Sequence, residues 1–159
     1  LILFASHRGV FALAHMSRVS ALAALPTRLV TYLEREHRVH PEELRAGLLP
    51  TIAKASYSLE SFEGGTTEEW YRRGWASRAS ERDIHVDIAG YTRQALVDAG
   101  VRPDRIECSD FDTASAWDPS KRSFLFSSHY RFKHPEVFGG DEEYEQRNIA
   151  IVGMPQSAV

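Results

Sequence analysis

The 159-residue sequence contains a single cysteine, Cys108, which excludes an intrachain disulfide and a Cys-Cys zinc motif. It also lacks an apolar run long enough to cross a bilayer and an N-terminal stretch with the pattern of a signal peptide. Lys and Arg number 19 against 22 Asp and Glu, so there is neither the basic excess typical of nucleic-acid binding nor an acidic tail. These absences predict a cytoplasmic protein whose partners are neither nucleic acids nor membranes.

Hydrophobic residues make up 43% of the chain, which is ordinary for a globular protein and argues against disorder. The length suits a single domain over residues 1–159 with a sizeable core. Leu1–Phe4 already has the pattern of an apolar strand, and no Met precedes it. We therefore expect that the domain lacks an N-terminal segment. An edge strand left unpaired there would be covered by such a segment or by another chain, as in a homo-oligomer.

The first 18 residues, LILFASHRGVFALAHMSR, predict a hairpin that ends on a histidine. Two apolar runs, Leu1–Phe4 and Val10–Ala14, flank a polar segment that ends in glycine and has the length of a hairpin loop. The second run ends on His15, directly before a helical pattern. An imidazole in that position suits a metal ligand or an acid–base group, and it is also compatible with an ordinary histidine at the edge of the core.

Helical and extended patterns alternate irregularly along the rest of the chain. A leucine stripe predicts a helix that starts near Ser17 or Ser20 and stops before Pro41, with Pro26 either in the first turn of its regular part or at a kink. Asp87 and Gly100 bracket a second helix. The other expected segments are strands at 46–49, 56–62, 105–108, 123–127 and 148–154, a short helix through Arg73, and loops at 74–82, 109–120 and 133–147, the last suited to a lid. No βαβ repeat is sustained, so the expected class is α+β with layered, mixed sheets.

Three features allow two interpretations each. His37 and His40 form either a metal pair or a solvated helix end, where the helix dipole favours protonated histidine. His85 and Asp87 would share a face as metal ligands only on a strand; alternatively, Asp87 caps the second helix. Cys108 is either a nucleophile or a small core residue.

Four stretches, in order along the chain, resemble the laccase-domain family of multicopper polyphenol oxidases, which also includes purine nucleoside phosphorylases with adenosine deaminase activity. VFALAHMSR resembles the family's strand ending in His-Ala-Gly-Trp-Arg-Gly, and ELRAGLLPTIAKASYSLESF its Ile-Gly-Pro-Ser-Ile and Cys-Cys-Tyr-Glu-Val segment. IHVDIAGYTRQALVDAGV resembles the helix that begins at Val-Asp-Leu. FSSHYR, followed by QRNIAIVGM, resembles the Phe-Phe-Ser-Tyr/His-Arg-Arg motif, the Gly-Arg pair and the closing strand.

The resemblance implies a layered α/β/β/α fold and a site formed by an early His, the Cys of an Asp-Cys pair and the His of the His-Ala-Gly motif. These three residues bind zinc in the family, while the older oxidase description implies copper. Only the third has a counterpart here, so His15 is the implied catalytic and metal-binding residue. When the later motifs are matched to the family's position by position, the resemblance also implies four substrate-binding residues: Ser128, His129, Arg131 and Arg147.

The chain departs from the family pattern within the same stretches. Met16-Ser17-Arg18 replaces Ala-Gly-Trp after the histidine, Ala55-Ser56 replaces the Cys-Cys pair, and Tyr130 replaces the first arginine of the later motif. These changes favour an alternative, a degenerate, non-catalytic relative that acts as a binding or scaffold domain. A laccase-type copper centre needs many imidazoles, and the sequence has no paired His-x-His motif.

If the family site is reproduced, the expected partners are a purine nucleoside and phosphate. Arg131 and Arg147 would hold the phosphate through charge-assisted hydrogen bonds, and Ser128 would donate a hydroxyl hydrogen bond. His15 would bind zinc or donate a proton to the departing base. The expected function is therefore that of a purine nucleoside phosphorylase and adenosine deaminase-like metalloenzyme.

Overall fold

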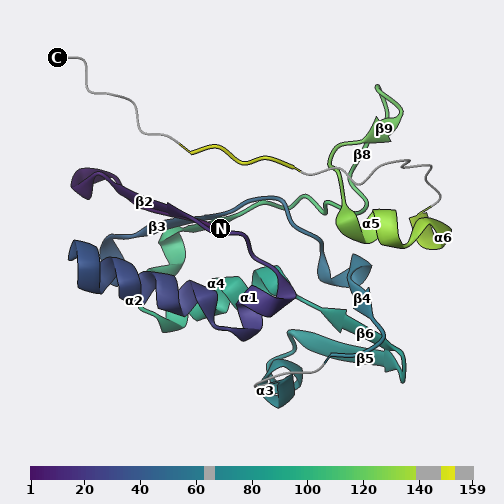
Figure 1. Cartoon of the computed structure of the whole chain (residues 1–159), viewed down its shortest axis with the longest axis horizontal. Coiled ribbons are helices and arrows are strands. Elements are labelled where there is room, and N and C mark those ends of the chain that lie inside the picture. Colours follow the sequence, from purple (N-terminus) through teal and green to yellow (C-terminus); the bar gives the residue numbers. More distant parts are fainter. Residues whose placement is uncertain (63–66, 139–147, 153–159) are drawn as a thin grey trace.

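The computed structural model describes residues 1–62, 67–138 and 148–152. Its strands are β1 (Ile2–Ala5), β2 (Val10–Leu13), β3 (Arg45–Leu48), β4 (Ser58–Leu59), β5 (Ala76–Ser80), β6 (Asp83–Val86), β7 (Ile106–Cys108), β8 (Trp117–Asp118) and β9 (Ser123–Phe124). Its helices are α1 (Arg18–Leu22), α2 (Leu25–His37), α3 (Thr67–Arg72), α4 (Ile88–Asp98), α5 (His129–Lys133) and α6 (Pro135–Phe138). One end of the molecule holds a sheet covered by α1, α2 and α4, and the other end holds the smaller sheets with α3, α5 and α6 (Figure 1).

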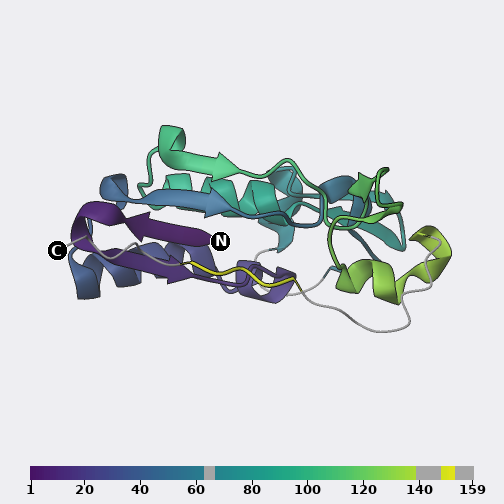
Figure 2. The ribbon, with the colours of Figure 1, turned by 90° about the horizontal axis from the view of Figure 1, so that it is seen from above.

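The larger sheet, sheet A, has the strand order β2-β1-β3-β7. β1 is antiparallel to both of its neighbours, and β3 is parallel to β7, so the sheet is mixed. Among the described residues, the helices that pack on this sheet lie on one of its faces, as the view onto the opposite face shows (Figure 2). Leu3 and Ala5 point into the helical layer and are buried, whereas Phe11 and Leu13 of β2 are 42% and 47% exposed on the other side. This pattern follows from the side-chain alternation of a strand.

The β1–β2 hairpin confirms the expectation from the first 18 residues. Ser6–Arg8 forms a single helical turn, and Gly9 completes the loop with a φ of +64°. Glycine adopts this left-handed conformation at no steric cost, which explains why the polar segment ends in that residue. The segment that follows β2 therefore leads directly to the start of α1.

The leucine stripe was expected to form one helix, but it forms two. α1 is capped by Ser17, whose hydroxyl accepts a hydrogen bond from the Ser20 N–H, and the chain breaks at Ala24, which has a φ of +54°. α2 then begins with Pro26 in its first turn, where a missing N–H costs nothing. It ends at His37, and that side chain is exposed, in agreement with a solvated helix end.

The second core lies under sheet C, whose strand order is β4-β6-β5. Trp70 of α3 is its largest buried side chain and stacks on Tyr91 of α4 with ring centroids 4.3 Å apart. The expected loop at 74–82 was wrong, because residues 76–80 form β5 and pair with β6. Only Ala76 of β5 is buried, so this edge strand carries little of the hydrophobic pattern that identifies a strand.

Asp87 caps α4: its carboxylate accepts a 2.7 Å hydrogen bond from the Gly90 N–H. His85 belongs to β6 and contacts Asp83 at 3.2 Å instead of Asp87. The helix-cap interpretation is therefore confirmed. Cys108 ends β7 with an exposed side chain, so its interpretation as a small core residue was wrong.

The C-terminal part is less regular than expected. The strand at 123–127 is reduced to β9, and the strand at 56–62 to β4. Residues 148–152 form no strand. The loop expected at 133–147 contains the last residue of α5 and all of α6, and its residues 139–147 lie outside the described residues. The α+β class with mixed sheets is nevertheless confirmed.

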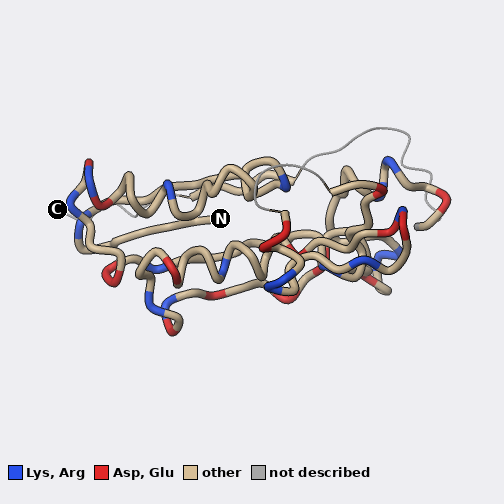
Figure 3. The backbone as a smooth tube through the Cα atoms, turned by 90° about the horizontal axis from the view of Figure 1, so that it is seen from below, with Lys and Arg blue, Asp and Glu red and all other residues tan. Residues whose placement is uncertain are grey.

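Charged residues of both signs are interspersed along the chain (Figure 3). In the part of the chain that the structure describes, no helix is long and apolar enough to cross a membrane.

Candidate functional site

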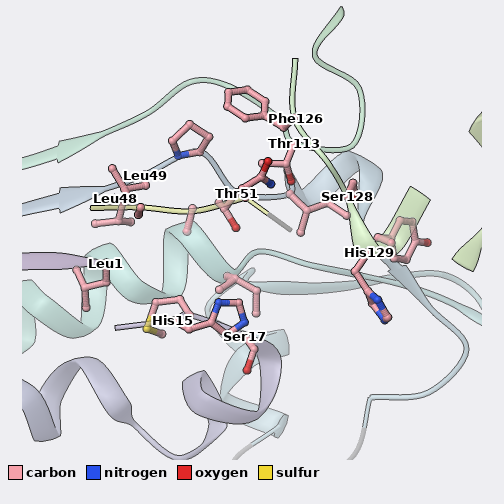
Figure 4. A pocket seen from close by; sticks show the side chains of 18 of the residues that line it. Leu1, His15, Ser17, Leu48, Leu49, Thr51, Thr113, Phe126, Ser128 and His129 are labelled. Carbon is pink, nitrogen blue, oxygen red and sulfur yellow. The ribbon is translucent and has the colours of Figure 1, made fainter. Parts of the chain in front are cut away.

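A cleft of about 980 Å³ lies where the two ends of the molecule meet. Its walls come from the residues after β2, the segment 48–52 after β3, the first turn of α4, and the segments 126–130 and 148–151. Figure 4 shows these walls converging from elements that are far apart in the sequence. Both halves of the fold therefore contribute residues to the walls of the cleft.

His15 lies in this cleft, between β2 and α1, as the sequence predicts. Its side chain is exposed, which argues against an ordinary histidine at the edge of the core. Its carbonyl oxygen accepts a 3.2 Å hydrogen bond from the Ser20 hydroxyl, so the backbone at His15 is fixed by the start of α1. Figure 4 shows the imidazole beside the Ser17 side chain.

Ser128 and His129 line another wall of the same cleft. Ser128 is buried and caps α5, because its hydroxyl oxygen accepts a hydrogen bond from the Arg131 N–H at 3.3 Å. His129 begins α5 and its side chain is exposed. Tyr130, the departure from the family motif, fastens α5 to β4: its hydroxyl donates to the Ser58 carbonyl at 2.8 Å and accepts from the Ser58 N–H at 3.1 Å.

Arg131 is buried, and its guanidinium donates hydrogen bonds to three backbone carbonyls. The acceptors are Thr113 at 3.3 Å, Ala114 at 3.2 Å and Phe126 at 2.8 Å. It also lies over the ring of Phe124, 3.8 Å from the centroid. Arg131 is not among the described residues that line the cleft, and these contacts join two chain segments behind it.

Arg147 lies outside the described residues. Of the predicted site residues, the structure thus brings His15, Ser128 and His129 to one cleft and places Arg131 in its supporting framework.

Zinc sites in proteins use three or four His, Cys or carboxylate ligands. Histidines 15, 129 and 134 line the cleft. Within the described ranges, however, no three side chains of these types lie close enough together to hold one ion. These residues alone do not fit a zinc or copper site, and His15 would need ligands from outside them.

Two cleft residues were missed as functional candidates in the sequence. Arg18 lines the cleft three residues after His15, at the position of the family's Trp, and Tyr57 lines it from the turn before β4. Burial raises the pKa of Tyr57, and the positive charge of Arg18 opposes that rise. The only sequence signal was the replacement itself, which removes an aromatic side chain and adds a cation.

The cleft carries no Asp or Glu side chain among its described lining residues, whereas Arg18 and Lys133 both line it. Hydroxyl groups of Ser17, Thr51 and Ser128 also line its walls. The described surface of the cleft is therefore suited to an anionic or hydrogen-bond-accepting ligand with an apolar part.

Comparison with solved structures shows that other proteins share this fold. The chain is similar to a solved structure of the Bacillus licheniformis hypothetical protein YfiH, with 20% identity and a TM-score of 0.66 over 83% of this chain and 48% of that one. It is also similar to YlmD from Geobacillus stearothermophilus, with 18% identity, a TM-score of 0.67 and the same coverages. The chain thus spans about half the length of these structures, and they share its fold.

No curated protein matches the chain closely enough to indicate a relationship. Residues 1–135, however, match the family model described as multi-copper polyphenol oxidoreductase laccase. This match includes His15, Ser128, His129 and Arg131 and covers most of the sequence. The chain belongs to the multi-copper polyphenol oxidoreductase laccase family.

Proposed function

We propose that this protein binds a purine nucleoside and phosphate in the cleft and catalyses phosphorolysis, as a purine nucleoside phosphorylase-like member of its family. The observation that carries the proposal is the placement of exposed His15 in a cleft whose described lining is cationic, rich in hydroxyls and free of carboxylates. Such a lining favours phosphate and the developing negative charge of a departing purine. The apolar residues of the cleft offer a surface to the base.

In phosphorolysis a phosphate oxygen bonds to C1′ of the ribose while the bond from C1′ to the purine nitrogen breaks. The electron pair of that bond leaves with the purine, which then takes up a proton. His15 is the proposed proton donor, because an imidazole exchanges protons readily near neutral pH and this one is accessible from the cleft. Ser128 and His129 are the proposed contacts to the ribose or phosphate.

The adenosine deaminase activity that the sequence resemblance implies is a further part of the proposal. Deamination needs an activated water, which a bound metal commonly supplies. Since the described residues alone do not fit a metal site, that activity would depend on ligands contributed from elsewhere.

The test is release of free base from inosine or adenosine with phosphate present. Loss of a general acid costs roughly 10²–10⁴ in rate, so H15A should lower kcat at least 100-fold. H37A is the matched control, since His37 is an exposed histidine at the end of α2 and does not line the cleft. Equal base release by H15A and H37A would contradict the role of His15.

A second candidate function is a non-catalytic binding or scaffold domain. It is favoured by Met16, which replaces the family's Ala and packs against both core clusters, so the turn after His15 has acquired a structural role. A folded wild-type protein that neither binds inosine in calorimetry nor releases base from it would support this alternative and contradict phosphorolysis. Measurable release of base would contradict this alternative.

A further inference from the structure

Two cationic side chains, Arg18 and Lys133, line the cleft within the described residues, and they differ in how firmly they are held. Lys133 is exposed at the end of α5, with its ammonium 5.4 Å from the ring of Phe132. Arg18 is half-buried at the first position of α1. Fixing a cation before the ligand arrives lowers the entropy cost of binding, so Arg18 is the better-prepared partner for an anion.

Arg18 is positioned by contacts from two sides. The reciprocal Ser17 and Ser20 hydrogen bonds cap α1 and fix the backbone there. At the far end of the side chain, Nη1 donates a 3.3 Å hydrogen bond to the carbonyl of Ser61, which is 43 residues away in the chain. A guanidinium carries five N–H donors, and in the described part of the chain no carboxylate pairs with this one. N–H donors on the planar guanidinium therefore remain available to an anion that accepts two parallel hydrogen bonds.

Tyr57 supplies a hydroxyl close to this charge. Its ring packs edge-on against Tyr130, with centroids 5.5 Å apart, and it lines the same cleft as Arg18. Burial raises the pKa of the phenol, so the group stays protonated at neutral pH and can donate a hydrogen bond. Within the described ranges the hydroxyl has no hydrogen-bond partner, which leaves that donor for a ligand.

We propose that Arg18 and Tyr57 form an anion-binding subsite of the cleft that takes a tetrahedral phosphate group. The inference rests on the proposed function and gives Arg18 the phosphate-binding role that the family pattern implies for Arg131. Arg131 is held by three carbonyls and does not line the described cleft, whereas Arg18 does. The ligand group is either inorganic phosphate or the phosphoryl group of a nucleotide, which share the same oxyanion chemistry.

The experiment measures the Kd of inorganic phosphate by calorimetry for the wild type and three variants. R18Q should weaken binding at least tenfold, because both the charge and the fork are lost. Y57F should weaken it roughly tenfold, because the lost hydrogen bond has a charged acceptor. R28Q removes the same charge from an exposed position on α2 and should leave Kd unchanged. An R18Q protein that binds phosphate as well as R28Q would overturn the proposal, as would a wild type that does not bind phosphate.

Melting curves show whether each variant is folded. R18K is a further variant that tests the geometry of binding, because a lysine keeps the positive charge but lacks the paired N–H donors of the guanidinium. R18K should bind phosphate between the wild type and R18Q, and wild-type affinity would contradict bidentate binding. Competition separates the two phosphate sources. Inosine 5′-monophosphate should displace inorganic phosphate if the subsite takes the phosphoryl group of a nucleotide, whereas the two should bind together if the subsite takes the co-substrate.

Base release distinguishes the two proposals. If phosphorolysis occurs, R18Q should raise the KM for phosphate at least tenfold and leave the Kd of inosine unchanged. Phosphorolysis with an unchanged KM in R18Q would contradict the subsite but support the proposed function. Phosphate binding that depends on Arg18, without base release, would support the subsite and contradict phosphorolysis.

Discussion

The hydroxyl of Ser56 donates a 2.5 Å hydrogen bond to the carboxylate of Asp112, which lies 56 residues further along the chain. The same carboxylate accepts hydrogen bonds from the Ser115 hydroxyl at 2.7 Å and from the N–H groups of Ala53 and Ala114 at 3.0 Å each. Asp112 therefore fastens the turn before β4 to the segment that contains Thr113, a residue of the cleft wall. Ser56 occupies one position of the family's Cys-Cys pair, so this departure has a structural use.

We predict that D112N lowers the free energy of unfolding by about 2 kcal/mol, because an amide cannot accept all four hydrogen bonds and loses the charge that strengthens them. S56A removes a single donor and should cost about 1 kcal/mol. Denaturant unfolding at pH 7 measures both. D110N is the control, since Asp110 is exposed two residues away. A D112N protein as stable as D110N would contradict the prediction.

The contribution of Asp112 should also depend on pH. Burial alone would raise the pKa of this carboxyl, but the hydrogen bonds from Ser56, Ser115, Ala53 and Ala114 outweigh burial and lower it. A pKa that is lower in the folded than in the unfolded chain stabilises the fold above the unfolded value, about 3.9, and this stabilisation is lost as the pH falls towards the folded value. The stability difference between wild type and D112N should stay constant from about pH 7 to 5 and shrink below about pH 4. A difference that grows in acid would contradict it.

R131K should destabilise the fold by about 2 kcal/mol. The Arg131 fork reaches the carbonyls of Thr113, Ala114 and Phe126 at once, and an ammonium on a flexible stem cannot serve all three in that geometry. The Ala114 carbonyl is buried and the other two are partly buried, so each one left without its donor costs free energy. Thermal unfolding measures the effect, with R122K as the control on an exposed arginine. Equal melting temperatures for the two variants would show that the carbonyls do not depend on the guanidinium.

The sequence predicted the features that local chemistry decides. Gly9 marked the hairpin loop, and Asp87 marked the start of α4. His15, expected as the last residue of a strand, lies two residues beyond Leu13, where β2 ends, and lines the cleft. β5 was missed because its side chains are mostly polar and exposed, so its pairing with β6 leaves little trace in hydrophobic periodicity.

The role proposed for Arg18 could not be predicted from the sequence, because the side chain is positioned by a contact with Ser61, which is distant in the sequence. The same holds for Arg131, since a motif position says that an arginine is present but not which carbonyls surround it.

Cys108 should react slowly with iodoacetamide at pH 7 despite its exposure. The side chain is exposed, but neighbouring atoms remove water from part of it, and this partial desolvation raises the thiol pKa. The charge of Arg93 opposes the rise, and that of Asp110 adds to it. Since the thiolate is the reacting species, the rate should be below that of free cysteine at pH 7 and should keep increasing above about pH 8.5, the usual thiol pKa. A rate that levels off below pH 8 would indicate an activated cysteine and contradict this prediction.

Gly90 provides a test in which the sign of an effect should reverse. Alanine in a helix interior is normally favoured over glycine by roughly 0.5–1 kcal/mol. A Cβ on Gly90 would collide with the Asp87 carboxylate, so G90A should disrupt the cap of α4 and lower the free energy of unfolding by about 1 kcal/mol. In a D87A background the carboxylate is absent, and the same change should be neutral or stabilising. Denaturant unfolding of the four proteins in this cycle measures the coupling. If G90A stabilised the protein in both backgrounds, the collision with Asp87 would not determine its effect.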